Sequence, residues 1–160
     1  MNDNPVVQAN DFSFKKSEKL RHRSLVETLF REGESLYAFP LRMVWKDFSN
    51  PEMNALFKHG LPPEIGKIQM MVTVPKKKRK RAVDRVLLRR RIREAYRLRK
   101  AMLNPTVESN PETRTLAIAL IYICGDNMPY KNISGAVMEL LEKLSRKLNR
   151  KYEENIDSPD

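Results

Sequence analysis

The residues best suited to chemistry in this sequence are basic side chains gathered in one stretch, residues 76–100. That stretch holds fourteen Lys or Arg and two acidic residues, whereas the whole chain of 160 residues carries a net charge of +11. The other 135 residues hold 17 basic and 18 acidic side chains, so the positive charge is confined to one place. Charge concentrated in this way predicts a polyanionic partner, and nucleic acid is favoured over a membrane.

Apolar residues recur within the stretch at helical spacing, which predicts a helix over residues 83–103 rather than a disordered charged tail. The predicted packing face consists of Leu88, Ile92, Ala95, Tyr96, Met102 and Leu103. A neighbouring arc of the same helix carries Arg85, Arg89, Arg93, Arg97 and Lys100, with Arg90 at its edge. Arginine keeps its charge when desolvated and can bind phosphate through two hydrogen bonds, so such a row suits a folded RNA.

A strand and a basic connector precede this helix. Residues 68–74 predict a strand, which Pro75 ends. The connector consists of Lys76, Lys77, Lys78, Arg79, Lys80 and Arg81. We therefore expect strand, connector and helix to form one unit, whose connector lysines and arginines bind RNA together with the helix arginines.

This unit resembles a known family. The segments Val72-Thr-Val-Pro-Lys-Lys77, Ala82-Val-Asp-Arg85 and Arg89-Arg-Arg-Ile-Arg-Glu-Ala-Tyr-Arg97 are similar, in order and spacing, to the signature of the protein subunit of bacterial ribonuclease P. In that signature a strand leads through a lysine loop into an Arg-Asn-Arg helix. Val86 and Leu87 stand here where the family has the asparagine and second arginine. We expect these two residues either to pack against an insertion at residues 47–67 or to leave a weaker RNA contact.

The resemblance implies both a fold and a function. The implied fold is an α/β domain of the α+β two-layer kind, a ribosomal protein S5 domain 2-like sandwich with a left-handed βαβ crossover through the basic helix. The implied function is that of a subunit of ribonuclease P, a cytoplasmic ribonucleoprotein endoribonuclease that matures the 5′ end of tRNA. The RNA subunit would carry the catalytic centre with its Mg²⁺, and the implied partners are ribonuclease P RNA and precursor tRNA.

The resemblance further implies a groove for the single-stranded 5′ leader of the substrate, between the first helix and the open face of the sheet. On this sequence the groove corresponds to Val26, Phe30, Arg42, Val44, Met71 and Thr73. Strand alternation independently places the last four of these away from the apolar face. Apolar contact and arginine can hold an unpaired strand with little sequence preference.

Composition predicts one domain over residues 14–150, interrupted by the insertion at about residues 47–67. Residues 1–13 have few apolar groups and predict a mobile segment, and the polar residues 151–160 predict a frayed tail. The first residues lack the charge and apolar run of a secretory signal, and the longest apolar run, residues 116–124, is too short to span a membrane. The single cysteine, Cys124, fits a reducing compartment and a place in the core.

The remaining elements follow from periodicity. A short helix ends at Glu32, with Gly33 after it. Residues 36–46 alternate as one strand, with Tyr37, Phe39 and Trp45 on its core face; residues 114–124 form a central strand buried on both faces; and residues 104–113 form a polar linker between the basic helix and that strand. Apolar residues from Ile133 to Leu148 predict a final amphipathic helix.

No grouping of side chains in this sequence predicts catalysis by the protein itself. His22 and His59 are far apart, one cysteine cannot build a zinc site, and no glycine-rich phosphate loop is present. We therefore expect no metal site or cofactor made by protein ligands, in agreement with a catalytic RNA.

Two alternative functions share some of these features. A basic ribosomal or ribosome-assembly protein would have the same charge and α/β layout, and only the ordered signature argues against it. A transcription factor using residues 83–103 as a recognition helix is disfavoured, because a strand precedes that helix where a helix-turn-helix protein has its first helix.

Overall fold

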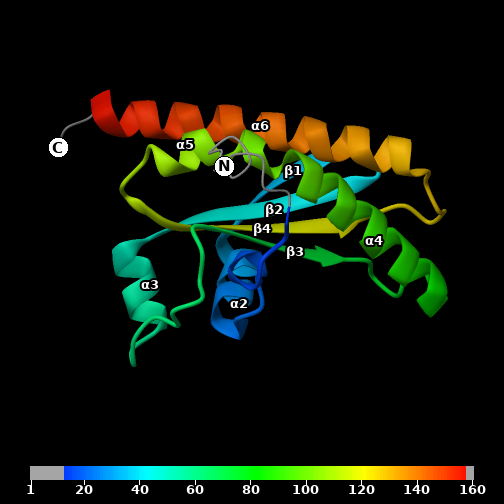
Figure 1. Cartoon of the computed structure of the whole chain (residues 1–160), viewed down its shortest axis with the longest axis horizontal. Helices are drawn as coiled ribbons and strands as arrows, with labels where there is room; N and C mark the ends of the chain where they lie inside the picture. Colours follow the sequence, from blue (N-terminus) through cyan, green and yellow to red (C-terminus); the bar gives the residue numbers. More distant parts are fainter. Residues whose placement is uncertain (1–12, 158–160) are drawn as a thin grey trace, which may run out of the picture.

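A four-stranded sheet lies at the centre of the computed structural model, which describes residues 13–157 (Figure 1). The strand order is β1 (Glu34–Ala38), β2 (Leu41–Ser49), β4 (Thr113–Tyr122) and β3 (Ile68–Thr73). Strand β4 pairs antiparallel with β2 and parallel with β3. Nine of its ten residues are buried, which confirms the central strand that its continuous apolar run predicted.

Helices cover both faces of this sheet (Figure 1). On one face lie α4 (Ala82–Arg99), α5 (Asn104–Glu108) and α6 (Tyr130–Asp157), and on the other lie α2 (Arg23–Glu32) and α3 (Asn50–Leu56). Two short 3₁₀ turns, η1 (Lys16–Glu18) and η2 (Lys100–Met102), complete the chain. The predicted fold class is confirmed, and the β3–α4–β4 connection between parallel strands is the crossover that the resemblance implied.

Each face of the sheet has its own apolar core because strand side chains alternate. The first core joins sheet residues such as Met43 and Ile118 to Ile92 of α4 and Leu140 of α6. The second core joins Val44, Phe48, Ala117, Ala119 and Ile121 of the sheet to Leu25 and Leu29 of α2 and Met53 of α3. The two predicted amphipathic helices, ending at Glu32 and beginning near Ile133, therefore pack on opposite faces of the sheet.

The predicted single strand over residues 36–46 is wrong, because Phe39 and Pro40 form a tight turn between β1 and β2. Ala38 pairs with Leu41 across this turn, so the side-chain parity shifts by one residue after it. Trp45 is in the core as predicted, with 3% exposure. Tyr37 and Phe39 are 57% and 64% exposed, so their predicted place in the core is wrong.

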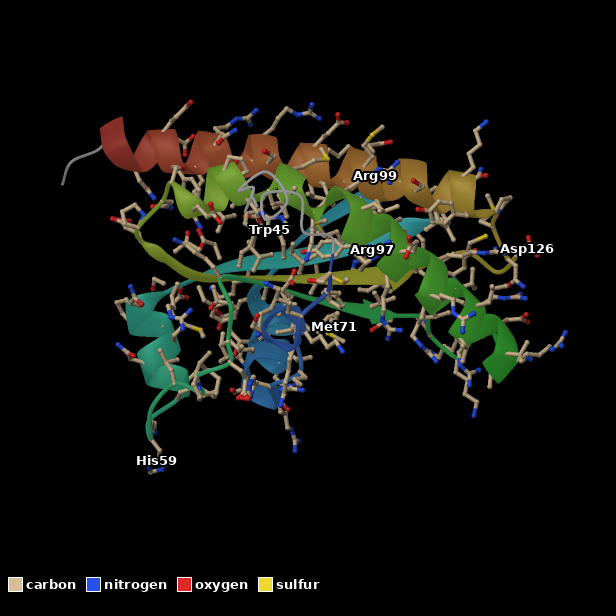
Figure 2. All side chains as sticks on the ribbon, viewed as in Figure 1. Trp45, His59, Met71, Arg97, Arg99 and Asp126 are labelled. Carbon is tan, nitrogen blue, oxygen red and sulfur yellow. The ribbon has the colours of Figure 1, made fainter. Side chains whose placement is uncertain are left out.

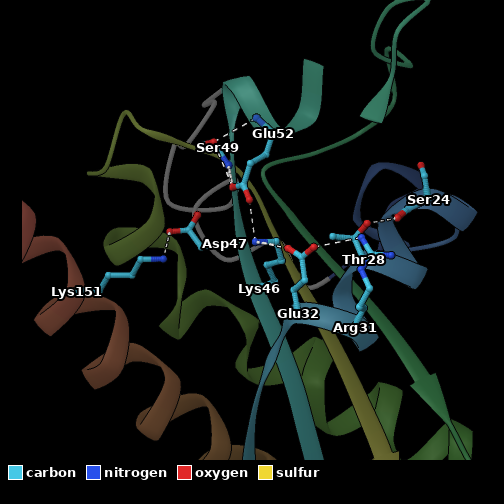
Figure 3. A network of polar contacts seen from close by, with 9 residues as sticks. All are labelled: Ser24, Thr28, Arg31, Glu32, Lys46, Asp47, Ser49, Glu52 and Lys151. Atoms are coloured by element: carbon cyan, nitrogen blue, oxygen red, sulfur yellow. Dashed lines mark hydrogen bonds and ion pairs between the residues drawn. The ribbon is translucent and has the colours of Figure 1, made fainter. Parts of the chain in front are cut away.

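The insertion that follows β2 holds one short helix, α3. Ser49 begins α3 with a reciprocal cap: the Glu52 amide donates to Ser49 Oγ at 3.3 Å, and the Ser49 amide donates to Glu52 Oε1 at 3.0 Å. Lys46 Nζ lies 2.9 Å from Glu52 Oε2 and 3.6 Å from Glu32 Oε1 of α2 (Figure 3). One lysine thus connects β2 to both helices on this face.

Two segments are more ordered than composition indicated. Helix α5 lies within the predicted polar linker at residues 104–113, and its Val107 is buried in the first core. Helix α6 continues through residues 151–157, where a frayed tail was predicted, because the Tyr152 hydroxyl contacts Thr113 Oγ1 at 2.9 Å and Asp47 Oδ2 at 3.3 Å. The segment predicted to be mobile lies, apart from Ser13, outside the described residues.

Candidate nucleic-acid interface

The basic helix α4 has the two faces that its sequence predicted. Leu88, Ile92, Ala95 and Tyr96 are buried against the sheet and α6. Met102 is 37% exposed, however, because α4 ends at Arg99 and Met102 lies in the 3₁₀ turn η2 that follows. The buried face fixes the helix, and the arginine arc beside it faces outward.

Four arginines of this arc line an open cleft of about 460 Å³. Its lining residues are Phe14, Val86, Arg89, Arg90, Arg93, Glu94 and Arg97. Arg97 Nη2 contacts Glu94 Oε2 at 2.7 Å, and this hydrogen bond with the paired charge raises the pKa of Arg97 and lowers that of Glu94. The cleft therefore presents four guanidinium groups, one of them held by Glu94, and one carboxylate, an arrangement suited to an anionic polymer.

Val86 is 47% exposed in this cleft, on the face of the sheet opposite α3. Of the two alternatives expected for Val86, packing against the insertion at residues 47–67 is therefore wrong, and a weaker RNA contact stays a prediction. Val86 instead forms part of the exposed surface of the cleft. Leu87 is partly buried.

The basic connector is shaped by its own arginines. Arg79 Nη2 donates to Asp84 Oδ2 at 3.0 Å, and Arg79 Nη1 donates to the Gly125 carbonyl. Arg85 Nη1 donates to the carbonyls of Arg79 and Lys80 at 2.9 and 2.7 Å. Arg79 and Arg85 thus hold the connector in place, which leaves exposed Lys76, Lys77, Lys78, Lys80 and Arg81.

Asp84 is the anchor of this connector and is 7% exposed. Asn127 Nδ2 donates to its Oδ1 at 3.0 Å. This hydrogen bond, with the charges of Arg81 and Arg79, lowers the pKa of Asp84 despite the opposing effect of burial. The carboxylate stays ionised and keeps Arg79 in position.

The predicted groove residues of the strands share one face of the sheet. Val44 and Met71 flank Ala119 in one cross-strand row, and Arg42 and Thr73 flank Ile121 in the next. Figure 2 shows Met71 on the α2 side of the sheet and Arg97 on α4, on the other side. The parity argument for these four strand residues is confirmed.

Helix α2 covers the first of these rows. We call the second the open row, because its Arg42 and Thr73 are partly exposed on either side of Ile121, which is buried at 8% exposure. Val44 is only 2% exposed, because α2 approaches β2 so closely that a Cβ on Gly33 would lie 2.8 Å from Val44 Cγ1. Val44 therefore supports the groove from beneath rather than lining it. Val26 of α2 packs against the second core, and Phe30, near the end of that helix, is 44% exposed.

Tyr37 is a residue of the open row that sequence reasoning missed. It pairs with Arg42 across β1 and β2, so it extends the row Arg42, Ile121 and Thr73 to the β1 edge of the sheet. Arg42 is fixed beside it, since its Nη2 donates to Ser35 Oγ at 3.0 Å. Recognising a turn at Phe39 and Pro40 would have revealed this position, because the turn places Tyr37 on the same face of the sheet as Arg42 instead of the face of Trp45.

The segment before α2 brings the two surfaces together. The Phe14 ring packs edge-on against Tyr96 of α4 with centroids 6.1 Å apart, and the Leu20 amide donates to the Met70 carbonyl at 3.0 Å. A second cleft, of about 640 Å³, lies at the edge of β3, and its lining includes Phe14, Lys19, Met71 and Arg93. Phe14 and Arg93 thus line both clefts.

No protein metal site or membrane helix is found in residues 13–157. No three His, Cys, Asp or Glu side chains of this region group closely enough to hold a metal ion. None of its helices combines the length and apolar character that crossing a bilayer requires. Cys124 is a buried residue of the first core.

Comparisons with known proteins agree with this geometry. The family model described as Ribonuclease P matches residues 14–145. The ribonuclease P protein component of Porphyromonas gingivalis W83 is 30% identical over 135 residues, which cover 84% of this chain and 88% of that protein. The protein component of Idiomarina loihiensis is 48% identical over 56 residues, covering 32% of this chain and 45% of that protein.

Solved structures share the fold at lower identity. The RNase P protein of Staphylococcus aureus has a TM-score of 0.56 at 17% identity, covering 81% of this chain and 96% of that one. The RNase P protein of Thermotoga maritima has a TM-score of 0.54 at 19% identity, covering 79% and 96%. Family match and relatives together show that this chain belongs to the ribonuclease P protein family, the protein components of an endoribonuclease whose catalytic RNA is a separate molecule.

Proposed function

We propose that two surfaces of this chain divide the work of tRNA 5′ maturation between two RNAs. The arginine cleft of α4 and the exposed connector lysines bind ribonuclease P RNA. The open row of the sheet binds the 5′ leader of precursor tRNA through Tyr37, Arg42 and Thr73, with the buried Ile121 beneath them and Phe30 and Met71 at its margin. Catalysis belongs to the RNA subunit and its Mg²⁺, and the protein supplies binding and position.

The observation that carries this proposal is the rigid mounting of the arginines. Buried residues one turn apart, such as Leu88 and Ile92, fix α4 against the sheet. Arg89, Arg90 and Arg93 therefore hold their spacing without a loss of backbone entropy on binding. Guanidinium groups carried on a fixed helix suit the closely spaced phosphates of a folded RNA.

The leader assignment is supported by the shape of the open row. The row crosses all four strands, so Tyr37 and Thr73 are separated by about 14 Å at the usual strand spacing. The exposed Tyr37 offers a stacking face and Arg42 offers positive charge, and neither contact requires a particular base. Such a surface accepts leaders of many sequences.

A comparison of leader lengths tests the proposal. The chain is combined with a bacterial ribonuclease P RNA and Mg²⁺, and cleavage is measured on precursor tRNAs with a long leader and with a single leader nucleotide. We expect Arg42→Ala, Met71→Ala and Tyr37→Ala to raise KM for the long leader and to leave kcat nearly unchanged, because binding is lost equally from ground and transition states.

Matched controls come from α6. Arg146 and Met138 are exposed on that helix, so Arg146→Ala and Met138→Ala remove the same side chains from a surface without a proposed role. Both should leave KM unchanged for either substrate. Equal defects on the two leader lengths would place the leader elsewhere on the protein.

A further inference from the structure

The cleft on α4 contains two apolar walls that phosphate binding does not need. Phe14 and Val86 line it together with Arg89, Arg90 and Arg93. Val86 is 47% exposed, although a valine gains nothing from contact with water or with a phosphate. A surface that bound only the RNA backbone would be lined by donors throughout.

Phe14 is held in place by residues far away in the sequence. Its ring packs against Tyr96 at an interplanar angle of 73°. The segment that carries it is fastened to η2, directly after α4, by Lys100 Nζ, which lies 2.6 Å from Glu18 Oε1, and to β3 by the Leu20 amide. The Phe14 wall of the cleft is thus held in place before a ligand binds.

The size and chemistry of the cleft fit a single nucleotide. Its volume of about 460 Å³ lies within the range of small-ligand sites and is too small for a duplex. The apolar walls suit the faces of a base, and the guanidinium groups suit the flanking phosphates. Base faces become available in this way only in unpaired RNA, because neighbouring base pairs cover them in a stacked helix.

We propose that this cleft binds one unpaired nucleotide of the RNA partner, with its base between Phe14 and Val86 and its phosphates on Arg89, Arg90 and Arg93. The inference rests on the proposed binding of RNA by α4. It gives Val86 a role: the residue that replaces the family's asparagine supplies an apolar face for the base. It also gives a role to the Phe14 ring, which packs against Tyr96 beside the arginines.

The test separates base binding from phosphate binding. Val86→Ser removes one wall, and Val83→Ser is its matched control, since Val83 is 66% exposed on the same helix and does not line the cleft. Phe14→Leu keeps an apolar anchor on Tyr96 while removing the aromatic face. Affinity for ribonuclease P RNA is measured over a range of salt concentrations, and base accessibility in the complex is mapped by chemical probing.

We expect Val86→Ser and Phe14→Leu to weaken RNA binding by about tenfold, in the range of a lost base stack, while Val83→Ser has no effect. The salt dependence should stay the same in all three, because no charge is removed. One nucleotide should be protected at its base by the wild-type chain and accessible with the two cleft variants. Thermal unfolding of the free proteins shows whether the Phe14→Leu variant is folded. If it is not, the result for Val86→Ser alone decides the test.

Other outcomes would overturn the inference. If Val86→Ser binds as tightly as wild type while Arg89→Ala weakens binding and its salt dependence, α4 binds RNA through phosphates alone and the proposed function stands. If neither changes the affinity, α4 is not the RNA surface, and the proposed function fails with the inference. Unchanged RNA binding by the cleft variants, with binding of an Asp/Glu-rich peptide that Val86→Ser abolishes, would assign the cleft to an acidic peptide.

Discussion

Arg79 Nη2 lies 3.0 Å from Asp84 Oδ2, and this ion pair connects the basic connector to the first turn of α4. The same guanidinium also donates to the Gly125 carbonyl, after β4. A positive side chain in the most basic part of the protein is therefore used to order its neighbours. The exposed lysines beside it gain a fixed backbone from which to reach RNA.

Asp84→Asn should weaken RNA binding even though it makes the chain more positive. Loss of the carboxylate frees Arg79 and loosens the connector, which outweighs the gain of one charge. The measurement is the dissociation constant for ribonuclease P RNA at fixed salt. The control is Glu142→Gln, which changes the net charge equally at an exposed site on α6 and should bind RNA as tightly as wild type or slightly more tightly. If Asp84→Asn also bound as tightly as wild type, the role of Asp84 in ordering the connector would be contradicted.

The same residue predicts a pH dependence of stability. The pKa of Asp84 is lower in the folded protein than its unfolded value of about 3.9, so its contribution is fully present above that pH and is lost as the pH falls through the folded value. Wild type should therefore be more stable than Asp84→Asn at pH 7, and the difference should shrink below about pH 4. Urea unfolding at pH 7 and pH 3 measures it, and an equal difference at both pH values would show that the charge is not involved.

Arg89→Ala, Arg90→Ala and Arg93→Ala combined should flatten the salt dependence of RNA binding. If each arginine neutralises about one phosphate, the slope of log affinity against log salt should fall by about 2 to 3. The control replaces Lys131, Arg146 and Arg150 on the exposed surface of α6. A slope that changes equally in both triple variants would mean that total charge, not the α4 arc, governs binding.

Gly33→Ala should destabilise the protein by about 1–3 kcal/mol, as overpacking does. A Cβ on this residue would lie 2.5 Å from the Leu29 carbonyl oxygen and 2.9 Å from that of Trp45, so α2 must move away from β2. Gly135→Ala is the opposite case, since nothing lies within 4 Å of its Cβ, and it should stabilise α6 by up to about 1 kcal/mol. Thermal unfolding of both variants and wild type is the measurement. If Gly33→Ala were as stable as wild type, α2 could move away from β2 without cost.

The protein freed of RNA should not cleave precursor tRNA at any Mg²⁺ concentration. In residues 13–157 no cluster of carboxylates, histidines or cysteine could hold the metal. Addition of a bacterial ribonuclease P RNA should restore cleavage at the mature 5′ end. Metal-dependent cleavage that survives nuclease treatment and repurification would assign catalysis to the protein.

Sequence patterns predicted best the elements whose two faces differ strongly. Helix α4 was recognisable because charge and apolar residues occupy different arcs, and β4 because its apolar run has no polar break. The turn at Phe39 and Pro40 was missed because it lacks the Asn-Gly type of signal and because alternation continues on both sides of it. That error placed Tyr37 in the core.

The site depends on contacts that no local pattern contains. Phe14 reaches Tyr96 from 82 positions away, and the neighbours of Val86 in the cleft include this distant ring. The burial of Val44 follows from the approach of α2 at Gly33. Periodicity gives the face on which a side chain lies, but the element that covers that face is set by tertiary packing.

The position of β4 between β2 and β3 imposes an order on synthesis. Arg42 and Thr73 are neighbours only through Ile121, so the proposed leader groove has no floor until the chain has been made to the end of β4 at Tyr122. The arginines of α4 leave the ribosome before that strand and before α6, the two elements that bury the other side of their helix. A nascent chain therefore exposes the basic residues of α4 before β4 and α6 can fix that helix. The last third of the sequence gives these residues the fixed positions that the proposed RNA binding requires.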